Sequence, residues 1–316
     1  MTNKDIGTFF KNHNAKFGRC LYPFHDCSSK PIQAHSIQNS TTFDLLQTNN
    51  HLIQLKMQFN PQIEPYLEFK SIGRNEASTF LGMCATHDNA LFEPIDKYPI
   101  DLENEEQKFL LAYRSVLKEF YAVMTGFIRI QKTYQERIAS GLIPGSDTKE
   151  MVTVEWGIKA YETHQYKEKF DIALKANDFS SIKHLFLLLN NQPPSIACSQ
   201  LFSADSYQYG DDVLRVVLNI LPIATDKTVI LFSSTEKEFS LAQSYLHRCF
   251  QGDDNFKKYE ISKLVIKNCE NFFINPKFFQ TWTREKQKKI MEYFSDTFRI
   301  DHDQDAVEYY LFENGA

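Results

Sequence analysis

Two short clusters of cysteine and histidine near the start of the chain place the strongest constraint on how it folds. Six residues separate Cys20 from Cys27, and two separate Cys84 from His87. Thiolate sulfur and imidazole nitrogen are ligands that zinc prefers, and their paired spacing is typical of a tetrahedral zinc site. We therefore expect these four side chains to bind one zinc ion. His25 lies inside the first pair and is an alternative ligand to Cys27.

The ligand spacing also predicts a treble-clef finger, in which a knuckle supplies two ligands and the first turn of a helix supplies the other two. A bound metal explains how an irregular segment folds with little core of its own. The other three cysteines, Cys198, Cys249 and Cys269, are expected to be buried thiols, because a chain of 316 residues does not need disulfides for stability.

Composition and charge indicate a globular chain without a dominant basic field. Hydrophobic residues make up 42%, which is ample for ordinary cores. Lysine and arginine number 35 against 40 acidic residues, so contact with nucleic acid requires a local patch. We found no run long enough to span a membrane and no secretory signal at the start, and we expect a cytoplasmic location with no membrane partner.

Hydrophobic periodicity predicts an α+β fold with three consecutive domains. Residues 1–100 form the zinc-binding treble clef, with strands at 32–37, 51–59 and 66–72. The last two strands are expected to form a hairpin inserted between His35 and the helix that carries the second ligand pair. Residues 101–178 form an antiparallel helical hairpin, with one helix over 104–140 and another from Ser146 or Asp147 to 176.

Residues 179–316 form the third predicted domain. Runs at 182–189, 195–202, 213–221 and 228–233 read as strands, and turn signals lie between them. The connections are short, which favours an antiparallel sheet. Helical patterns follow at 236–250 and 284–297. We expect an antiparallel sheet with helices in this domain.

The segments around the zinc ligands resemble a known superfamily. The run Ala34-His35-Ser36-Ile37, followed by Gly82-Met83-Cys84-Ala85-Thr86-His87-Asp88 and Leu91-Phe92, is similar to the HNH or His-Me finger endonucleases over roughly residues 1–95. Residues 77–80 and 109–114 also resemble segments of an uncharacterised bacterial family. The resemblance implies metal-dependent hydrolysis of nucleic acid, and a role in bacterial antiviral defence is a further expectation.

The resemblance also implies roles for three residues. His35 is expected to be the general base, Asn75 to orient it, and Asp88 to hold a second divalent cation, magnesium or manganese. Asn39 and Asn89 are alternative partners of His35. The competing hypothesis is a noncatalytic zinc-stabilised module that binds nucleic acid, a protein partner or a second copy of the chain. Replacing His35 with alanine separates the two hypotheses.

Overall fold

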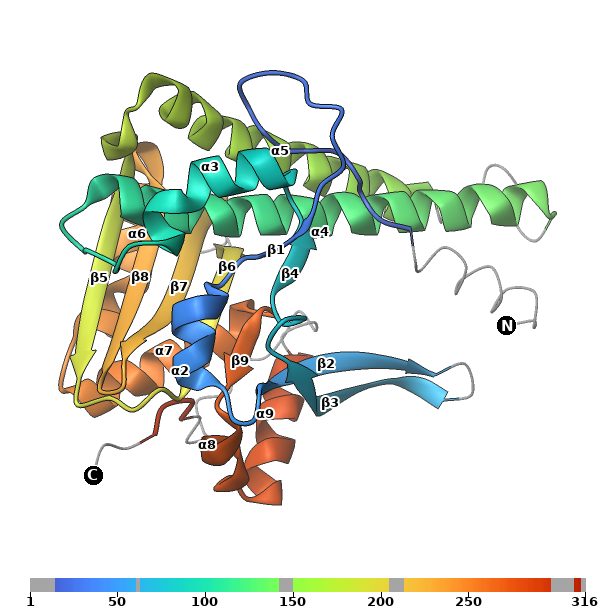
Figure 1. Cartoon of the computed structure of the whole chain (residues 1–316). Coiled ribbons are helices and arrows are strands. Elements are labelled where there is room, and N and C mark those ends of the chain that lie inside the picture. The colour runs from blue at the N-terminus through green and yellow to red at the C-terminus, as the bar shows by residue number, and fades with distance from the viewer. Residues whose placement is uncertain (1–14, 61–62, 142–149, 205–212, 297–309, 314–316) are drawn as a thin grey trace. The chain divides into compact units, whose positions relative to one another are not determined.

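The computed structural model describes residues 15–60, 63–141, 150–204, 213–296 and 310–313 (Figure 1). By their contacts the residues group into two compact units that are interleaved along the chain. We call residues 1–34, 80–91 and 116–178 the cluster unit, and residues 35–79, 92–115 and 179–316 the sheet unit. Each unit combines segments from different parts of the chain. The units therefore do not test the predicted domain boundaries at residues 100 and 178, which stay a prediction.

A seven-stranded antiparallel sheet forms the centre of the sheet unit, which confirms the α+β class and the predicted antiparallel pairing. Figure 1 shows the strands β5, β8, β7 and β6 side by side. The strand order is β3 (Ile63–Gly73), β2 (His51–Asn60), β9 (Phe272–Ile274), β6 (Ile196–Ala204), β7 (Leu214–Ala224), β8 (Lys227–Thr235) and β5 (Ile182–Asn190).

The predicted hairpin at 51–59 and 66–72 is confirmed as β2 and β3. His51 pairs with Gly73, and the register continues to Gln58 opposite Tyr66. The short strand β9 was not predicted. It pairs with β2 through Ile53 and Ile274 and with β6 along its full length, so it joins the hairpin to the C-terminal strands in one sheet.

Helices of the C-terminal segment pack on the sheet and complete its apolar core. The predicted helix at 236–250 is divided into two 3₁₀ turns around α6 (Phe239–Leu246), and the predicted helix at 284–297 is α9 (Arg284–Asp296). The helices α7 (Asp254–Asn268) and α8 (Pro276–Gln280) were not predicted. The core combines strand residues with α6 and α7, including Val216, Leu218, Ile230, Leu246, Ile261 and Val265.

A buried polar network joins the first part of α4 (Glu105–Ala139) to the sheet. Ser115 Oγ lies 2.7 Å from Ser199 Oγ and donates to Asn219 Oδ1 at 3.0 Å. All three residues are buried. Buried hydroxyl and amide groups are stable when they have hydrogen-bond partners, so this network fixes how the helix lies on β6 and β7.

The second part of α4 and α5 (Glu150–Ala176) form the predicted antiparallel hairpin in the cluster unit. Phe120 lies against His164, whereas Gly126, further along α4, lies against Trp156, earlier on α5. The predicted helix start at Ser146 or Asp147 lies outside the described residues. Among the helices that the structure describes, none combines the length and apolar character needed to cross a membrane.

The elements around the ligand pairs are short. β1 (Gln33–His35) and β4 (Thr79–Leu81) form a separate two-stranded sheet, and α3 (Ala85–Asp96) begins directly after Cys84. A π-turn over Asn39–Phe43 and the single turn α2 (Asp44–Leu46) lie between β1 and β2. Cys20 and Cys27 lie in a segment without helix or strand, whereas Cys84 precedes α3 and His87 lies in its first turn.

Candidate metal centre

The four predicted ligands come together in the cluster unit. The ligand atoms of Cys20, Cys27, Cys84 and His87 all lie within 4.8 Å of one another, close enough to bind a metal ion. This is the only group of three or more cysteine, histidine or acidic side chains with such spacing in the part of the chain that the structure describes. His25, the alternative to Cys27, is not part of the group.

The interatomic distances fit a tetrahedral zinc site. Cys27 Sγ lies 3.9 Å from Cys84 Sγ, and the Nδ1 atom of His87 lies 3.5 Å from Cys20 Sγ and 3.4 Å from Cys84 Sγ. Zinc bonds of about 2.3 Å to sulfur and about 2.0 Å to nitrogen place ligand atoms about 3.5 to 3.8 Å apart in a tetrahedron. The thiols are free, and 3.9 Å is far longer than a disulfide bond.

Backbone hydrogen bonds fix both ligand pairs. Leu21 N donates to Gly82 O at 2.9 Å, which ties the first pair to the turn before α3. Ile32 N donates to Met83 O at 2.8 Å. The amide of Cys84 donates to Cys20 Sγ at 3.3 Å. Hydrogen bonds to a ligand sulfur orient it and stabilise its thiolate form, so the Cys84 amide favours Cys20 as a metal ligand.

Aromatic rings enclose the histidine ligand. Tyr22 stacks on His87 with ring centroids 3.7 Å apart and an angle of 8° between the planes. His25 meets His87 edge-on at 5.2 Å. These contacts fix the plane of the imidazole, which keeps Nδ1 directed at the sulfur atoms. His25 therefore contacts the ring of His87 and is not one of the four grouped side chains.

The protonation of the ligands follows from their surroundings. Burial raises the pKa of Cys20, although backbone amide hydrogen bonds oppose it. Cys27 has a lowered pKa because the backbone of Ser29 hydrogen-bonds to it. Burial, followed by the nearby charge of His25, lowers the pKa of His87 and favours the neutral imidazole that binds metals. When zinc is bound, it holds cysteine ligands as thiolates.

His35, the candidate base, lies in the sheet unit. Backbone groups of Arg74 and Asn75 hydrogen-bond to His35, and Nε2 is buried without a partner among the described residues. Burial lowers the pKa of His35, so the ring is neutral at pH 7. The backbone therefore holds one side of the imidazole, and the Nε2 side is closed off from solvent.

The other two candidate catalytic residues have different surroundings. The side chain of Asn75 accepts a hydrogen bond from Asn39 Nδ2 at 3.0 Å, so Asn75 is linked to His35 through its backbone. Asp88 is buried in the first turn of α3 and belongs to the cluster unit, whereas His35 belongs to the sheet unit. The combined role of His35, Asn75 and Asp88 stays a prediction.

An arginine–carboxylate pair near His35 was not predicted. Arg114 donates two hydrogen bonds to Asp96, at 2.8 and 2.6 Å, and its guanidinium lies 4.0 Å from the ring centroid of Phe92. Both charges act on the pKa of His35. Arg114 is buried, and a buried charge is unusual without a partner of opposite charge. That partner, Asp96, lies 18 residues earlier in the chain. Helical periodicity alone could not have paired them.

In comparisons with known proteins, the chain matches no protein-family model, no curated protein and no solved structure.

Proposed function

We propose that this chain is an HNH-like endonuclease that hydrolyses phosphodiester bonds of nucleic acid, with His35 as general base and a structural zinc ion held by the four-residue cluster. The observation that carries the proposal is the setting of His35. Its ring is held by the backbone of Arg74 and Asn75, while Nε2 has no partner in the part of the chain that the structure describes. A general base requires one nitrogen that fixes the ring and a second that accepts a proton.

The order of elements around the cluster supports the treble-clef part of the proposal. The knuckle with Cys20 and Cys27 comes first, the paired strands β1 and β4 follow, and α3 begins after Cys84 and carries His87. Four protein ligands complete a tetrahedron, and a closed site of this kind stabilises the fold without binding a substrate. Zinc is therefore assigned a structural role.

In the proposed reaction, neutral His35 takes a proton from water as the water oxygen forms a bond to phosphorus. The phosphorus–oxygen bond to the departing sugar oxygen then breaks, and solvent protonates that oxygen. The lowered pKa of His35 keeps the imidazole in the neutral form that accepts the proton at pH 7. Asn75 orients the ring through its backbone.

A second divalent cation, magnesium or manganese, would neutralise charge on the phosphate when bound. Asp88 is the residue that we assign to it. The described residues contain no second group of three cysteine, histidine or acidic ligands beside the cluster, so the fit of this cation rests on one carboxylate. We derive no step of the reaction from it.

Two observations favour a second candidate function, a noncatalytic zinc-stabilised module that binds nucleic acid or a protein partner. The side-chain oxygen of Asn75 accepts a hydrogen bond from Asn39, and it is the backbone of Asn75 that hydrogen-bonds to His35. The free Nε2 atom of His35 is also shielded from solvent. A structural histidine in a small core has these features, and such a module needs no proton transfer.

The substitution His35→Ala separates the two functions. Purified protein is incubated with single- and double-stranded DNA and RNA in the presence of magnesium or manganese, and zinc content is measured in parallel. We expect the variant to lose about 10²- to 10⁴-fold of the cleavage rate while it keeps its zinc. His51→Ala, an exposed histidine of β2, is the matched control and should cleave normally.

Two other outcomes of this experiment would lead to a different function. Cleavage at an unchanged rate by His35→Ala would remove His35 from the reaction. Absence of cleavage by the unmodified protein on all four substrates, with one zinc ion bound per chain, would favour the noncatalytic module. In that case, a shift of labelled nucleic acid on addition of the protein would identify the partner class.

A further inference from the structure

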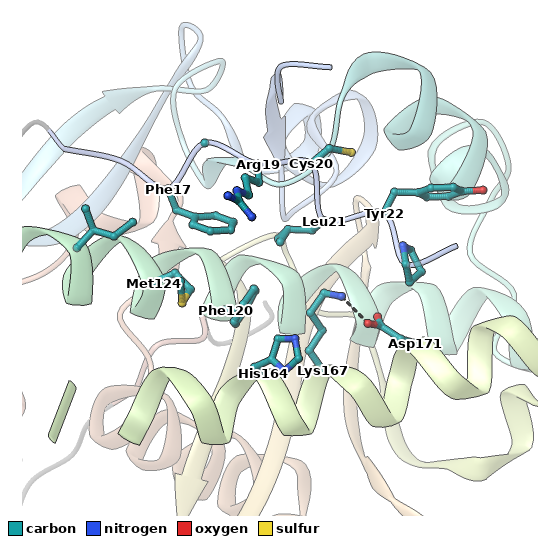
Figure 2. Close-up of a pocket in the computed structure, with 13 residues that line it drawn as sticks. Phe17, Arg19, Cys20, Leu21, Tyr22, Phe120, Met124, His164, Lys167 and Asp171 are labelled. Atoms are coloured by element: carbon teal, nitrogen blue, oxygen red, sulfur yellow. Dashed lines mark hydrogen bonds and ion pairs between the residues drawn. The ribbon is translucent and has the colours of Figure 1, made fainter. Parts of the chain in front are cut away.

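A cavity of about 670 Å³ lies next to the metal centre in the cluster unit (Figure 2). The extended segment 17–23 forms one wall, and the facing sides of α4 and α5 form the others. Sites for small molecules have volumes of about 300 to 1,000 Å³, so this one is large enough for an organic ligand. Its apolar lining includes Phe17, Leu21, Phe120, Met124 and Ile128.

Hydrogen bonds fix the extended wall at both ends. Phe17 N donates to Thr125 Oγ1 at 3.2 Å, which attaches the start of the segment to α4. Leu21 N donates to Gly82 O, and the neighbouring Cys20 belongs to the metal cluster. A wall that is held in this way loses little conformational entropy when a ligand binds. The extended wall is therefore held in place at these two points.

The charge that remains at the cavity is positive. Lys167 Nζ and Asp171 Oδ2 form an ion pair at 2.6 Å, drawn as a dashed line in Figure 2, and this pair cancels both charges. Arg19 also lines the cavity and is exposed, and its guanidinium has no hydrogen bond or ion pair with another described residue. His164 projects from α5 toward the same space.

Aromatic rings lie beside these basic groups. The rings of Phe17 and Phe120 meet edge-on with centroids 6.0 Å apart, and His164 lies 5.6 Å from Phe120. Planar bases pack on aromatic side chains, and guanidinium groups form paired hydrogen bonds with phosphate oxygens. The cavity thus combines an apolar aromatic surface with an unpaired cation at one side.

We infer that this cavity binds a nucleoside monophosphate, with the base against Phe17 and Phe120 and the phosphate on Arg19 and His164. Inorganic phosphate would leave most of the volume empty, and an uncharged nucleoside would leave Arg19 without an anion. The site is independent of hydrolysis at His35, because it is formed by residues of the cluster unit alone.

Calorimetric titration with four probes tests the inference: adenosine 5′-monophosphate, adenosine, inorganic phosphate and 1-naphthoate. We expect the nucleotide to bind saturably and each of the other three to bind about tenfold more weakly or worse, because each lacks the phosphate, the base or both. Equal binding of adenosine and its monophosphate would overturn the role of Arg19. Equal binding of 1-naphthoate would overturn the assignment to nucleotides, as would the absence of saturable nucleotide binding at millimolar concentration.

Variants locate the binding in this cavity. Arg19→Gln should weaken nucleotide binding about tenfold or more and leave adenosine binding unchanged. Lys16→Gln removes one positive charge from the same segment outside the cavity and is the matched control, with an expected change below about twofold. Met124→Trp fills the apolar floor and should abolish binding of the nucleotide at unchanged zinc content. Unchanged binding by Met124→Trp, or an equal effect of the two charge variants, would overturn the inference.

Discussion

Two histidines in the sheet unit differ in the groups that hold their rings. His35 and His184 both have a buried Nε2 atom without a partner among the described residues. The ring of His35 is held by backbone groups near a charged pair, whereas His184 Nδ1 lies 2.8 Å from the hydroxyl of Ser233 inside the sheet. The first arrangement is the one for which we propose proton transfer. The second makes His184 a structural residue whose charging opposes folding.

Stability at acidic pH is expected to depend on His184. Burial, followed by the nearby charge of Lys108, lowers its pKa from 6.5 to about 4. As the pH falls, His184 takes up a proton in the unfolded chain before it does so in the folded protein. Stability is therefore greatest above pH 6.5 and falls as the pH drops towards 4. Between pH 7.5 and 4.5 the loss from this residue is about 2.5 kcal/mol.

Urea unfolding of the unmodified protein and of His184→Asn, at pH 7.5 and at pH 4.5, measures this loss. The asparagine amide can replace the contact with Ser233 but does not titrate. The variant should therefore lose about 2.5 kcal/mol less than the unmodified protein over this interval. Because both proteins carry the same metal ligands, acid release of zinc cancels in the difference. Equal losses would mean that His184 charges without cost in the folded state.

Helices and strands whose apolar residues repeat at a regular spacing were predictable, and those without such a repeat were not. The stripe that includes Phe109, Tyr113 and Phe120 repeats at helical spacing, and α4 follows it to within one residue at each end of the predicted range. Strand β9 has three residues, too few for a period. Helix α7 buries Lys258 and Glu260 as well as apolar side chains, so its sequence has no single apolar stripe.

Two glycines of the α4–α5 hairpin are expected to respond differently to the same substitution. A methyl group added at Gly126 would lie 2.4 Å from the ring of Trp156, whereas one added at Gly157 would lie 3.4 Å from Phe127, an ordinary contact. Glycine to alanine inside a helix stabilises it by about 1 kcal/mol. Overpacking costs about 1 to 3 kcal/mol, so it offsets or exceeds that gain at Gly126.

We therefore expect Gly157→Ala to raise the free energy of unfolding by about 0.5 to 1 kcal/mol and Gly126→Ala to leave it unchanged or lower it. Chemical unfolding followed by circular dichroism gives both values. Tryptophan fluorescence should also change for Gly126→Ala, because the indole of Trp156 has to move. Equal stabilisation by the two substitutions would show that this ring moves aside at no cost.

On the scale of the whole molecule, the sequence predicted the metal centre better than its surroundings. The grouping of the four side chains was predicted because cysteine and histidine pairs have few other uses at such spacing. The Arg114–Asp96 pair near His35 was not, because the two residues carry no motif. Strand β9 joins the inserted hairpin to strands far along the chain, and such long-range pairing has no local signal.

Removal of zinc is expected to affect one compact unit before the other. All four ligands belong to the cluster unit, and the strands of the seven-stranded sheet belong to the sheet unit, which has its own apolar core. A structural zinc ion contributes its binding energy to the folding of the segments that bind it. Without it, the irregular segment 20–27 and the first turn of α3 lose the contacts that hold them together.

Hydrogen–deuterium exchange with and without a zinc chelator measures this difference between the units. Backbone amides of 20–32 and 80–91 should exchange at least about tenfold faster after chelation, whereas those of β6, β7 and β8 should keep their protection. Added zinc should restore the slow rates, which separates metal loss from damage by the chelator. Simultaneous loss of protection in the strands would mean that the two units unfold as one cooperative structure, because local opening of the cluster cannot expose amides in the centre of a sheet.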